Sequence, residues 1–354
     1  MGEHSVMAIT GTPNNRHRVE WIDFVKGIAI TLVVYGHVMQ GVFAGRPVTE
    51  LGFFRASDAF IYSFHMPAFF IVSGLLSRSL WDVSLVKYIG EKARTIAWPY
   101  VVWFVLGTFS AVCFSKYYNH ASTNPLMALT CLVWNPGSFW FLHAFFLVHV
   151  LAALLRKLPL SVLLLISIFG FWISRFCPNE AIHNVLYHFP FMVIGLFGSV
   201  HLIKIDSFFR RWGAICFIPL LLIQLAATIL ISNVSWPVKL WLGVSGTAGI
   251  ASLASCVFST ILFPIFCRIG YASLGVFLMH PYFQGISRAL LHHLPGMHAP
   301  ILLVLLETLC GIIIPVFIYE KAMKTKWRLF FTFKRAELRK INMQNDAETA
   351  LKTS

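Results

Sequence analysis

Long runs of apolar residues, separated by short polar segments, extend along almost the whole chain. An α-helix needs about 20 apolar residues to cross the hydrocarbon core of a bilayer, and ten runs come close to this length. They predict membrane-spanning helices at residues 26–44, 58–77, 97–115, 138–155, 159–175, 185–203, 212–232, 237–263, 270–291 and 299–320. A shorter apolar stretch, 126–134, is expected to lie in the membrane interface. The pattern predicts an all-α integral membrane protein, a bundle of about ten transmembrane helices.

The eighth predicted span, 237–263, carries three glycines at intervals of three residues: Gly243, Gly246 and Gly249. Glycine weakens a helix, but in a membrane it also lets two helix backbones approach closely. The sequence leaves both interpretations open, so this span has the least defined boundaries.

The composition of the 354 residues excludes a soluble domain. Hydrophobic residues make up 58% and charged residues only 12%, whereas soluble domains carry about 25% charged residues. The formal net charge of +14 is spread over short basic clusters between the apolar runs, which argues against a nucleic-acid partner. The seven cysteines show no paired spacing, so neither a disulfide framework nor a zinc site is expected.

The distribution of Lys and Arg predicts the orientation of the bundle. With ten spans, 22 of the 28 basic residues fall on one side, and cytoplasmic loops carry such an excess. The six on the other side are Arg46, Arg55, Lys116, Arg175, Lys239 and Arg288. We therefore expect both termini in the cytoplasm and a multi-pass protein of the bacterial cytoplasmic (inner) membrane.

Three parts of the chain are expected: a cytoplasmic N-terminal tail at 1–17, one membrane domain at 18–320 and a basic cytoplasmic tail at 321–354. The first twenty residues lack an apolar core, so no cleavable signal peptide is expected. The basic stretch from Lys321 to Lys340 is expected to lie on anionic lipid headgroups.

Four ionisable side chains are expected deep in the bilayer, each in a different span. A rise of about 1.5 Å per residue puts His37 roughly 16 Å from the cytoplasmic end of the first span, and His65 roughly 10 Å from the outer end of the second. His280 and Glu307 fall at similar depths in the ninth and tenth spans. A single histidine in a membrane helix is usually a packing residue, but four such groups at one depth predict a polar cavity.

No metal site is expected, because no two of the three deep histidines share a helix at ligand spacing. His143 and His149 in the fourth span are weaker candidates that packing explains equally well.

A polar cavity of this kind supports two chemistries. A neutral imidazole can take the proton of a hydroxyl as that hydroxyl attacks an acyl carbon. Alternatively, His and Glu side chains can relay protons through a transporter. Composition and depth do not choose between them.

Sequence motifs favour acyl transfer. The segment from Arg18 to His37, which contains Asp23, Lys26-Gly27 and a final Gly-His pair, resembles the opening signature of membrane acyltransferase family 3, whose members O-acylate carbohydrates. Within this family the chain is most similar to the fucose 4-O-acetylase-like branch. The family pattern is a basic residue followed, after ten residues, by a histidine; here these are Lys26 and His37.

Further stretches match the family in the order of its motifs: Phe64-His65-Met66-Pro67, Lys92-Ala-Arg94 followed by Pro99-Tyr100, Ser138-Phe-Trp140-Phe-Leu142 and Leu278-Met279-His280-Pro281. Lys92-Ala-Arg94 departs from the usual Arg-x-x-Arg, so the resemblance does not fix the roles of individual basic residues there. The similarity covers residues 18 to 320.

The resemblance implies an enzyme, an O-acyltransferase that moves an acyl group, most simply acetyl, from acyl-CoA to a hydroxyl of a cell-surface glycan or its lipid-linked precursor. Acetyl-CoA or another acyl-CoA would be the donor substrate, and no permanently bound cofactor is expected. A tunnel would bring the pantetheine arm of the donor up from the basic face, and the acceptor would enter from the other side.

The resemblance also implies a role for each candidate residue. The catalytic group would be His37, as general base or acyl relay, with Asp23, His65 and Glu307; Lys26, Lys92 and Arg94 would bind the donor phosphates; Trp140 and His280 would bind the acceptor. Other interpretations stand beside these: positive-inside charge for the basic residues, complementation of the helix dipole for Asp23 and interfacial anchoring for Trp140.

Two other functions remain as alternatives: a transporter or flippase of glycan precursors with a proton-relay cavity, and a structural subunit of a glycan-export complex. Transporters are usually built from repeats, and the sequence shows no internal repeat. The gathering of ionisable residues at one depth argues against a purely structural subunit.

Overall fold

The computed structural model describes residues 19–43, 52–113, 125–134, 136–230, 235–292 and 300–333. Within these ranges all regular elements are helical and no strand occurs, which confirms the expected all-α fold. The predicted tail at 1–17 and most of the tail at 321–354 lie outside the described residues.

The elements follow one another as α1 (Glu20–Val42), α2 (Gly52–Tyr62), α3 (His65–Leu75), α4 (Ser79–Asp82), α5 (Leu85–Lys92), a π-helical turn η2 (Ala93–Ala97), α6 (Trp98–Cys113), α7 (Pro125–Trp134), a 3-10 turn η4 (Gly137–Phe139), α8 (Trp140–Leu154), α9 (Leu160–Ser174), α10 (Glu180–Ser199), α11 (Leu202–Leu230), α12 (Trp236–Val257), α13 (Leu262–Tyr271), α14 (Ser273–His292), α15 (Pro300–Met323) and a 3-10 turn η5 (Lys326–Phe330).

Seven helices of the described chain are long and apolar enough to cross a membrane, and an eighth crossing results if α13 and α14, which meet at an angle of 84°, form one broken span. The seven are Glu20–Val42, Ala56–Leu75, Thr130–Leu154, Glu180–Ser199, Leu202–Thr228, Trp236–Val257 and Pro300–Met323. The predicted spans 97–115 and 159–175 correspond to α6 and α9, which have only 16 and 15 residues. The count of about ten spans therefore stays a prediction.

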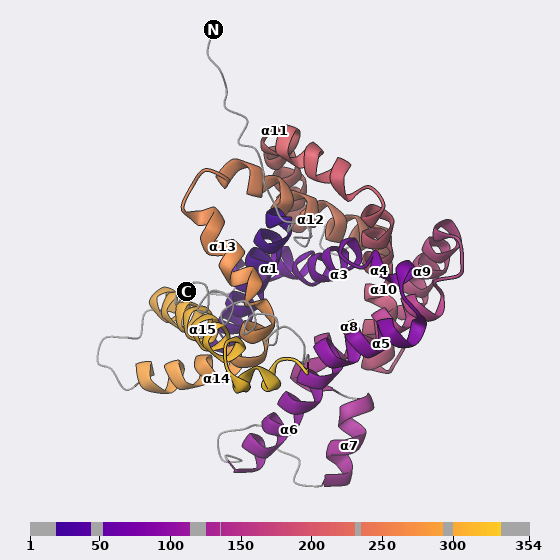
Figure 1. Ribbon diagram of the computed structural model, residues 1–354. Coiled ribbons are helices and arrows are strands. Elements are labelled where there is room, and N and C mark those ends of the chain that lie inside the picture. The colour runs from indigo at the N-terminus through magenta and orange to yellow at the C-terminus, as the bar shows by residue number, and fades with distance from the viewer. Residues whose placement is uncertain are drawn as a thin grey trace, which may run out of the picture.

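Helix α1 lies in the middle of the bundle, with α11 and α12 at one edge and α6 and α7 at the other (Figure 1). It packs against α13, α15, α3, α12 and α14. The contact with α13 depends on two glycines that face each other, because a side chain on Gly27 would strike the Phe266 carbonyl and one on Gly270 would strike the Asp23 carbonyl. Facing small residues are a common way for membrane helices to approach closely.

Helix α12 decides between the two interpretations of the glycines in the eighth predicted span. The helix is unbroken from Trp236 to Val257. A side chain on Gly243 would meet the Phe191 ring, and one on Gly246 would meet Phe64, so these glycines mark close helix contacts. The predicted end at residue 263 is wrong, because the chain turns after Val257 and α13 begins at Leu262.

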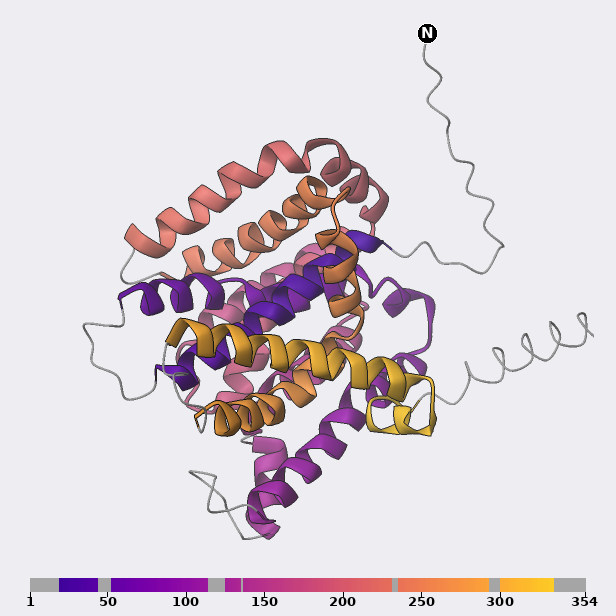
Figure 2. The ribbon, with the colours of Figure 1, turned by 90° about the vertical axis from the view of Figure 1, so that its left-hand side faces the viewer.

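Large apolar side chains cover much of the outer surface, for example Ile215, Ile218 and Leu222 on α11 and Ile313 and Phe317 on α15. Such a surface is stable only in contact with lipid, which supports a multi-pass membrane protein. Figure 2 shows that the N-terminal end of α1 and the C-terminal end of α15 lie on the same side of the bundle.

Candidate active site

Histidines from three segments meet around the C-terminal half of α1. The rings of His37 and His280 are in edge-to-face contact, with centroids 5.2 Å apart. His65, the first residue of α3, packs edge-to-face on Tyr62 at 4.8 Å, and His37 is close enough to interact electrostatically with both His65 and His280. The structure thus brings together three of the four groups predicted at one depth.

A break between α2 and α3 positions His65. Its ring nitrogen Nδ1 donates to the Ile61 carbonyl at 2.7 Å, and the Phe64 backbone N–H donates to the same carbonyl at 3.3 Å. Gln224 of α11 donates to the Ser63 hydroxyl within the break at 2.6 Å. Backbone groups freed inside a membrane must find partners, and these contacts provide them.

Hydrogen bonds to backbone carbonyls also fix the tautomers of two histidines. A carbonyl oxygen can only accept, so Nδ1 carries the hydrogen in His65, bound to Ile61, and in His280, which donates to Val276 at 3.0 Å. In a neutral ring Nε2 is then an acceptor. Both side chains are buried, and the Nε2 of His280 has no partner among the described residues. His37, by contrast, has an exposed side chain.

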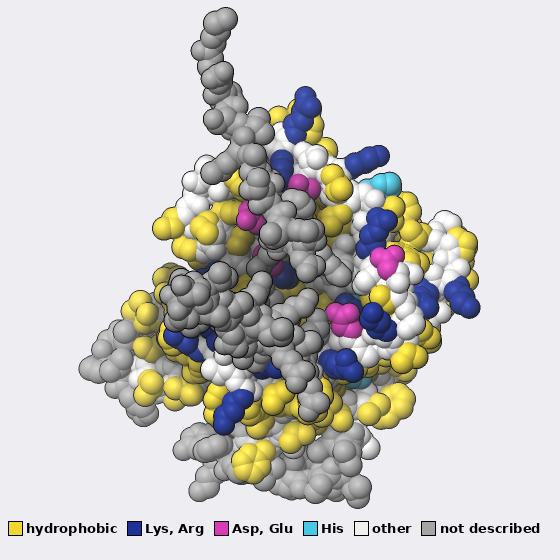
Figure 3. Space-filling view, in the orientation of Figure 1, with side chains coloured by type: hydrophobic (Ala, Val, Ile, Leu, Met, Phe, Trp, Pro, Cys, Tyr) yellow, Lys and Arg dark blue, Asp and Glu magenta, His cyan; other side chains and the backbone are white. Residues whose placement is uncertain are grey.

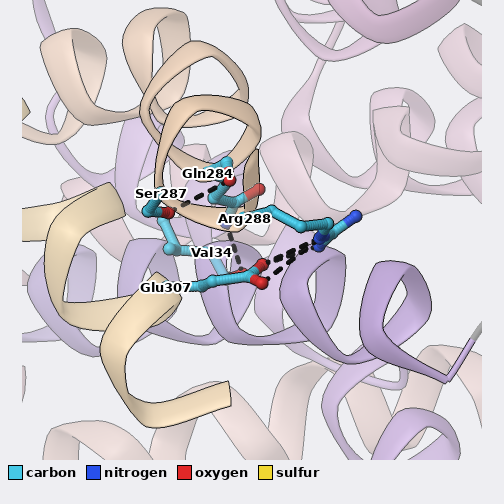
Figure 4. Close-up of polar contacts among 5 residues, drawn as sticks. All are labelled: Val34, Gln284, Ser287, Arg288 and Glu307. Carbon is cyan, nitrogen blue, oxygen red and sulfur yellow. Dashed lines mark hydrogen bonds and ion pairs between the residues drawn. The ribbon is translucent and has the colours of Figure 1, made fainter. Parts of the chain in front are cut away.

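Glu307 is fully buried and forms a bidentate ion pair with Arg288 of α14, with a shortest distance of 2.7 Å between Nη2 and Oε2 (Figure 4). The Arg288 guanidinium lies against Gly41 of α1, one turn beyond His37. Gln284 of the same α14 face donates to the Val34 carbonyl at 2.9 Å. The fourth deep group therefore belongs to an ion pair beside the histidine cluster.

A cavity of about 230 Å³ lies between α1, α3, η2, α8 and α14. Lys26 lines it together with apolar side chains and the hydroxyl-bearing residues Ser73, Thr95 and Ser273. Phe277 also lines the cavity, and its ring centroid is 6.2 Å from that of His280. The cavity therefore reaches from Lys26 to the side of the histidine cluster.

Lys26 and Asp23 form an ion pair of 2.6 Å one turn apart on α1. Asp23 is buried, and Lys26 is half-buried at the cavity wall. The ion pair places Asp23 beside Lys26, and the roles that the resemblance implies for both residues stay predictions.

The other predicted phosphate-binding residues, Lys92 at the end of α5 and Arg94 in η2, come just before the cavity residue Thr95 in the sequence. Lys92 places its ammonium 5.2 Å from the centroid of the Tyr88 ring. Arg94 is exposed in η2, the π-helical turn that also contributes Thr95 to the cavity. In the face of the molecule that Figure 3 shows, many Lys and Arg side chains lie at the surface.

His149 is buried and hydrogen-bonded on both sides. Ser73 Oγ lies 2.8 Å from its Nε2, and the Tyr88 hydroxyl lies 2.8 Å from its Nδ1. Burial raises the pKa of Tyr88 to about 12, so the phenol is protonated at neutral pH. This hydrogen-bonded chain leads from the cavity to α5.

Trp140 lies at the start of α8, where its ring packs on His188 with centroids 5.4 Å apart. His188 in turn stacks on Phe70 at 4.5 Å. The structure assigns Trp140 to this aromatic group, and a role in acceptor binding stays a prediction.

Sequence reasoning missed several polar residues of this region. The orientation count took Arg288 as a loop charge on the outer side, whereas it lies in α14 and pairs with Glu307. The signal was in its spacing: Arg288 follows Gln284 by four residues and His280 by eight, which puts all three on one helix face. Asp58 and Tyr62, four residues apart on α2, share a face in the same way.

Within the described ranges, no group of three or more His, Cys, Asp or Glu side chains is arranged to hold a metal ion.

Comparisons with known proteins agree with the motifs. A family model described as an acyltransferase domain matches residues 19–320. The nodulation protein NolL of Mesorhizobium japonicum (strain LMG 29417 / CECT 9101 / MAFF 303099) is 32% identical over 178 residues, which are 49% of this chain and 46% of that protein. NolL of Sinorhizobium fredii (strain NBRC 101917 / NGR234) is 32% identical over 131 residues, 34% of this chain and 32% of that protein.

This chain thus matches less than half the length of either curated relative. No solved structure matches it. The family model confirms the family expected from the motifs and the enzyme class, and it does not distinguish the fucose 4-O-acetylase-like branch from others.

Proposed function

Because the chain belongs to the acyltransferase family whose model covers residues 19–320, we propose that it is a membrane O-acyltransferase. It moves an acyl group, most simply acetyl, from acyl-CoA to a hydroxyl of a cell-surface glycan or its lipid-linked precursor. The observation that carries the proposal is the position of His37, which contacts His280 beside a cavity lined by Lys26.

The cavity fits the pantetheine arm of the donor. Lys26 supplies a cation for the phosphates at one end, and Lys92 and Arg94 lie in the adjoining segment. A pantetheine arm carries two amide groups along an otherwise apolar chain, and it needs hydrogen-bonding partners inside an apolar tunnel. Ser73, Thr95 and Ser273 offer hydroxyls along the cavity wall.

His37 acts as the general base. The oxygen of the acceptor hydroxyl attacks the thioester carbonyl carbon, and its proton passes to the His37 imidazole as the C–O bond forms and the C–S bond breaks. The CoA thiolate then takes a proton from the imidazolium. The Nε2 atoms of His65 and His280 can accept hydrogen bonds, so they stabilise the charged ring while it exists.

Glu307 has a positioning role in this proposal. Its carboxylate accepts three hydrogen bonds from Arg288, and the pair holds α14 and α15 beside α1. The same pairing removes the carboxylate that a proton-relay transporter would use.

The proposed orientation has both termini in the cytoplasm of a bacterium, with the donor entering at the Lys26 end of α1. The acceptor then approaches from the opposite face of the inner membrane. The basic stretch from Lys321 to Lys340, whose residues from 334 on lie outside the described ranges, is proposed to contact anionic lipid headgroups.

Donor affinity and turnover separate the proposed roles. In purified Lys26→Ala and Arg94→Ala proteins, loss of a charge-assisted contact should weaken acyl-CoA binding roughly 10- to 150-fold. In His37→Ala, binding should stay near wild type while acyl transfer is abolished, because a base acts mainly in the transition state. Calorimetric binding of acetyl-CoA and transfer of labelled acetyl measure the two effects.

The matched controls are Lys204→Ala on the exposed start of α11 and His201→Ala, also exposed. Both should bind donor and turn over like wild type. Normal acylation by a well-folded His37→Ala protein would falsify the assignment of the base, and unchanged binding in both basic variants would place the donor elsewhere.

A further inference from the structure

Three polar side chains that none of the motifs contains lie one turn beyond His37. Gln40 of α1 donates from Nε2 to the Tyr62 hydroxyl at 2.9 Å and to Asp58 Oδ1 at 3.3 Å. Asp58 and Tyr62 are one turn apart on α2. We call Gln40, Asp58 and Tyr62 the acceptor platform.

The acceptor platform is continuous with the histidine cluster. The Tyr62 ring packs on His65 at 4.8 Å, and it fills the space that a side chain on Gly36 would need. Gln40 follows His37 by three residues, about 4.5 Å along the helix axis. A molecule held by these side chains therefore lies within one helical turn of the proposed base.

Accessibility distinguishes the platform from the buried polar residues around it. His65 and His280 are each 2% exposed and Glu307 is fully buried, whereas Tyr62 is 38% exposed. Gln40 is exposed like His37, and Asp58 is half-buried. Packing residues would be covered, so this open group beside the base is placed to meet a substrate.

The chemistry of the three groups selects the kind of molecule. A carboxylate accepts hydrogen bonds, and a phenol and an amide both donate and accept, which matches neighbouring hydroxyl groups on a sugar. The Tyr62 ring offers an aromatic face to the C–H groups of a pyranose. The carboxylate would repel a phosphorylated group held at this place.

The donor and the platform occupy opposite ends of α1. Gln40 is fourteen residues beyond Lys26, about 21 Å along the axis. The Lys26 cation at the cavity thus lies far from the platform, and His37 lies between the two on α1. On these grounds, and resting on the proposed function, we propose that Gln40, Asp58 and Tyr62 bind the acceptor as an uncharged pyranose through its neighbouring hydroxyls.

The test uses the full chain purified in detergent, with labelled acetyl-CoA and four p-nitrophenyl glycosides: α-L-fucoside, β-D-glucoside, β-D-galactoside and N-acetyl-β-D-glucosaminide. Asp58→Asn should raise KM for the accepted glycoside roughly 10-fold or more, and Tyr62→Phe roughly 2- to 12-fold. The dissociation constant of acetyl-CoA should stay within twofold of wild type, which a general loss of structure would not allow.

Matched controls are Asp206→Asn, in an exposed ion pair on α11, and Tyr35→Phe, which packs with Val38 and Val304 on another face of α1. Both should keep the wild-type KM. Unchanged acceptor KM in Asp58→Asn and Tyr62→Phe, with active wild type, overturns the platform alone. Glucose 6-phosphate is assayed beside the four glycosides, and preference for it over every neutral glycoside overturns the ligand class. A wild-type protein that binds no acetyl-CoA contradicts the proposed function itself.

Discussion

The Arg288 guanidinium rests on the α-carbon of Gly41 and occupies the space that any side chain at position 41 would need. From there it reaches Glu307, which is fully buried. A buried ion pair gains little overall, but removal of one partner leaves the other charged and unpaired, at a cost of about 3–5 kcal/mol. The pair therefore joins α1, α14 and α15 more strictly than an apolar contact would.

We expect Glu307→Gln to lower the free energy of unfolding by about 3–5 kcal/mol and the double variant Arg288→Met/Glu307→Gln to recover much of that loss. The exposed pair Arg268–Glu320, also bidentate at 2.6 and 2.7 Å, is the control. Glu320→Gln should cost at most about 1 kcal/mol. Denaturation in mixed detergent micelles measures all of these. Equal losses at the two pairs would contradict a special role for the buried one.

The depth of a residue could be predicted from the sequence, but its partner could not. His37, His280 and Glu307 each follow from their distance to the end of an apolar run. The Arg288–Glu307 pair forms across two helices, and the rotation of one helix against another is not contained in the length of a run. Asp58 was missed because the predicted span begins at residue 58, which places Asp58 at the end of the span, whereas α2 already begins at Gly52.

At the scale of elements, α1 and α13 approach each other closely at Gly27 and Gly270. The atom that a side chain on Gly270 would strike is the Asp23 backbone carbonyl, which cannot move without displacing α1. Asp23 in turn pairs with Lys26 at the cavity. Helix packing and the proposed donor site therefore meet at this point.

Gly270→Ala should lower the free energy of unfolding by about 1–3 kcal/mol and weaken acetyl-CoA binding, because it pushes α1 away from α13. Gly285→Ala in α14 is the matched control, since nothing lies within 4 Å of the added carbon. It should be neutral or slightly stabilising, because alanine favours a helix over glycine by about 0.5–1 kcal/mol. Thermal unfolding and donor titration of both variants provide the measurement, and equal behaviour of the two would rule out the coupling.

The apolar pattern predicted the boundaries of a helix well where one helix fills one apolar run. It predicted them wrongly where two elements share one run. The predicted 237–263 joined the end of α12 to the turn before α13, because the apolar residues continue through the turn. The predicted 270–291 found α14 but not the 84° bend at its start. An apolar run records contact with lipid or core, and a bend inside it leaves the composition unchanged.

For the whole molecule, the shared side of the α1 start and the α15 end requires an even number of crossings between them (Figure 2). Together with the excess of basic residues on one side, this predicts cytoplasmic termini. A phosphatase fusion after the C-terminal residue should be inactive, and one in the segment around Lys116, outside the described residues, should be active. An active C-terminal fusion would reverse the orientation.

Sequence reasoning described the molecule as one membrane domain at residues 18–320 between two tails, and this division stays a prediction. It did not foresee that the segment after α15 returns to η2. There Trp98 donates to the Leu329 carbonyl and the Phe333 backbone N–H donates to the Arg94 carbonyl at 3.0 Å. These contacts join residues more than 200 positions apart, and no local pattern encodes them.

The central place of α1 has a consequence for the order in which the protein is made. α1 is the first described helix to leave the ribosome, whereas α13, α14 and α15, which pack against it, leave last. During synthesis His37 therefore has no contact with His280 until α14 is made, and Arg288 has no contact with Glu307 until α15 is inserted. A chain that ends prematurely before α13 carries the complete opening motif, yet it lacks His280, one neighbour of the proposed base, and the Arg288–Glu307 ion pair. If the proposed site is correct, it is complete only when the last helix is inserted, and an N-terminal fragment with the family signature is expected to be inert.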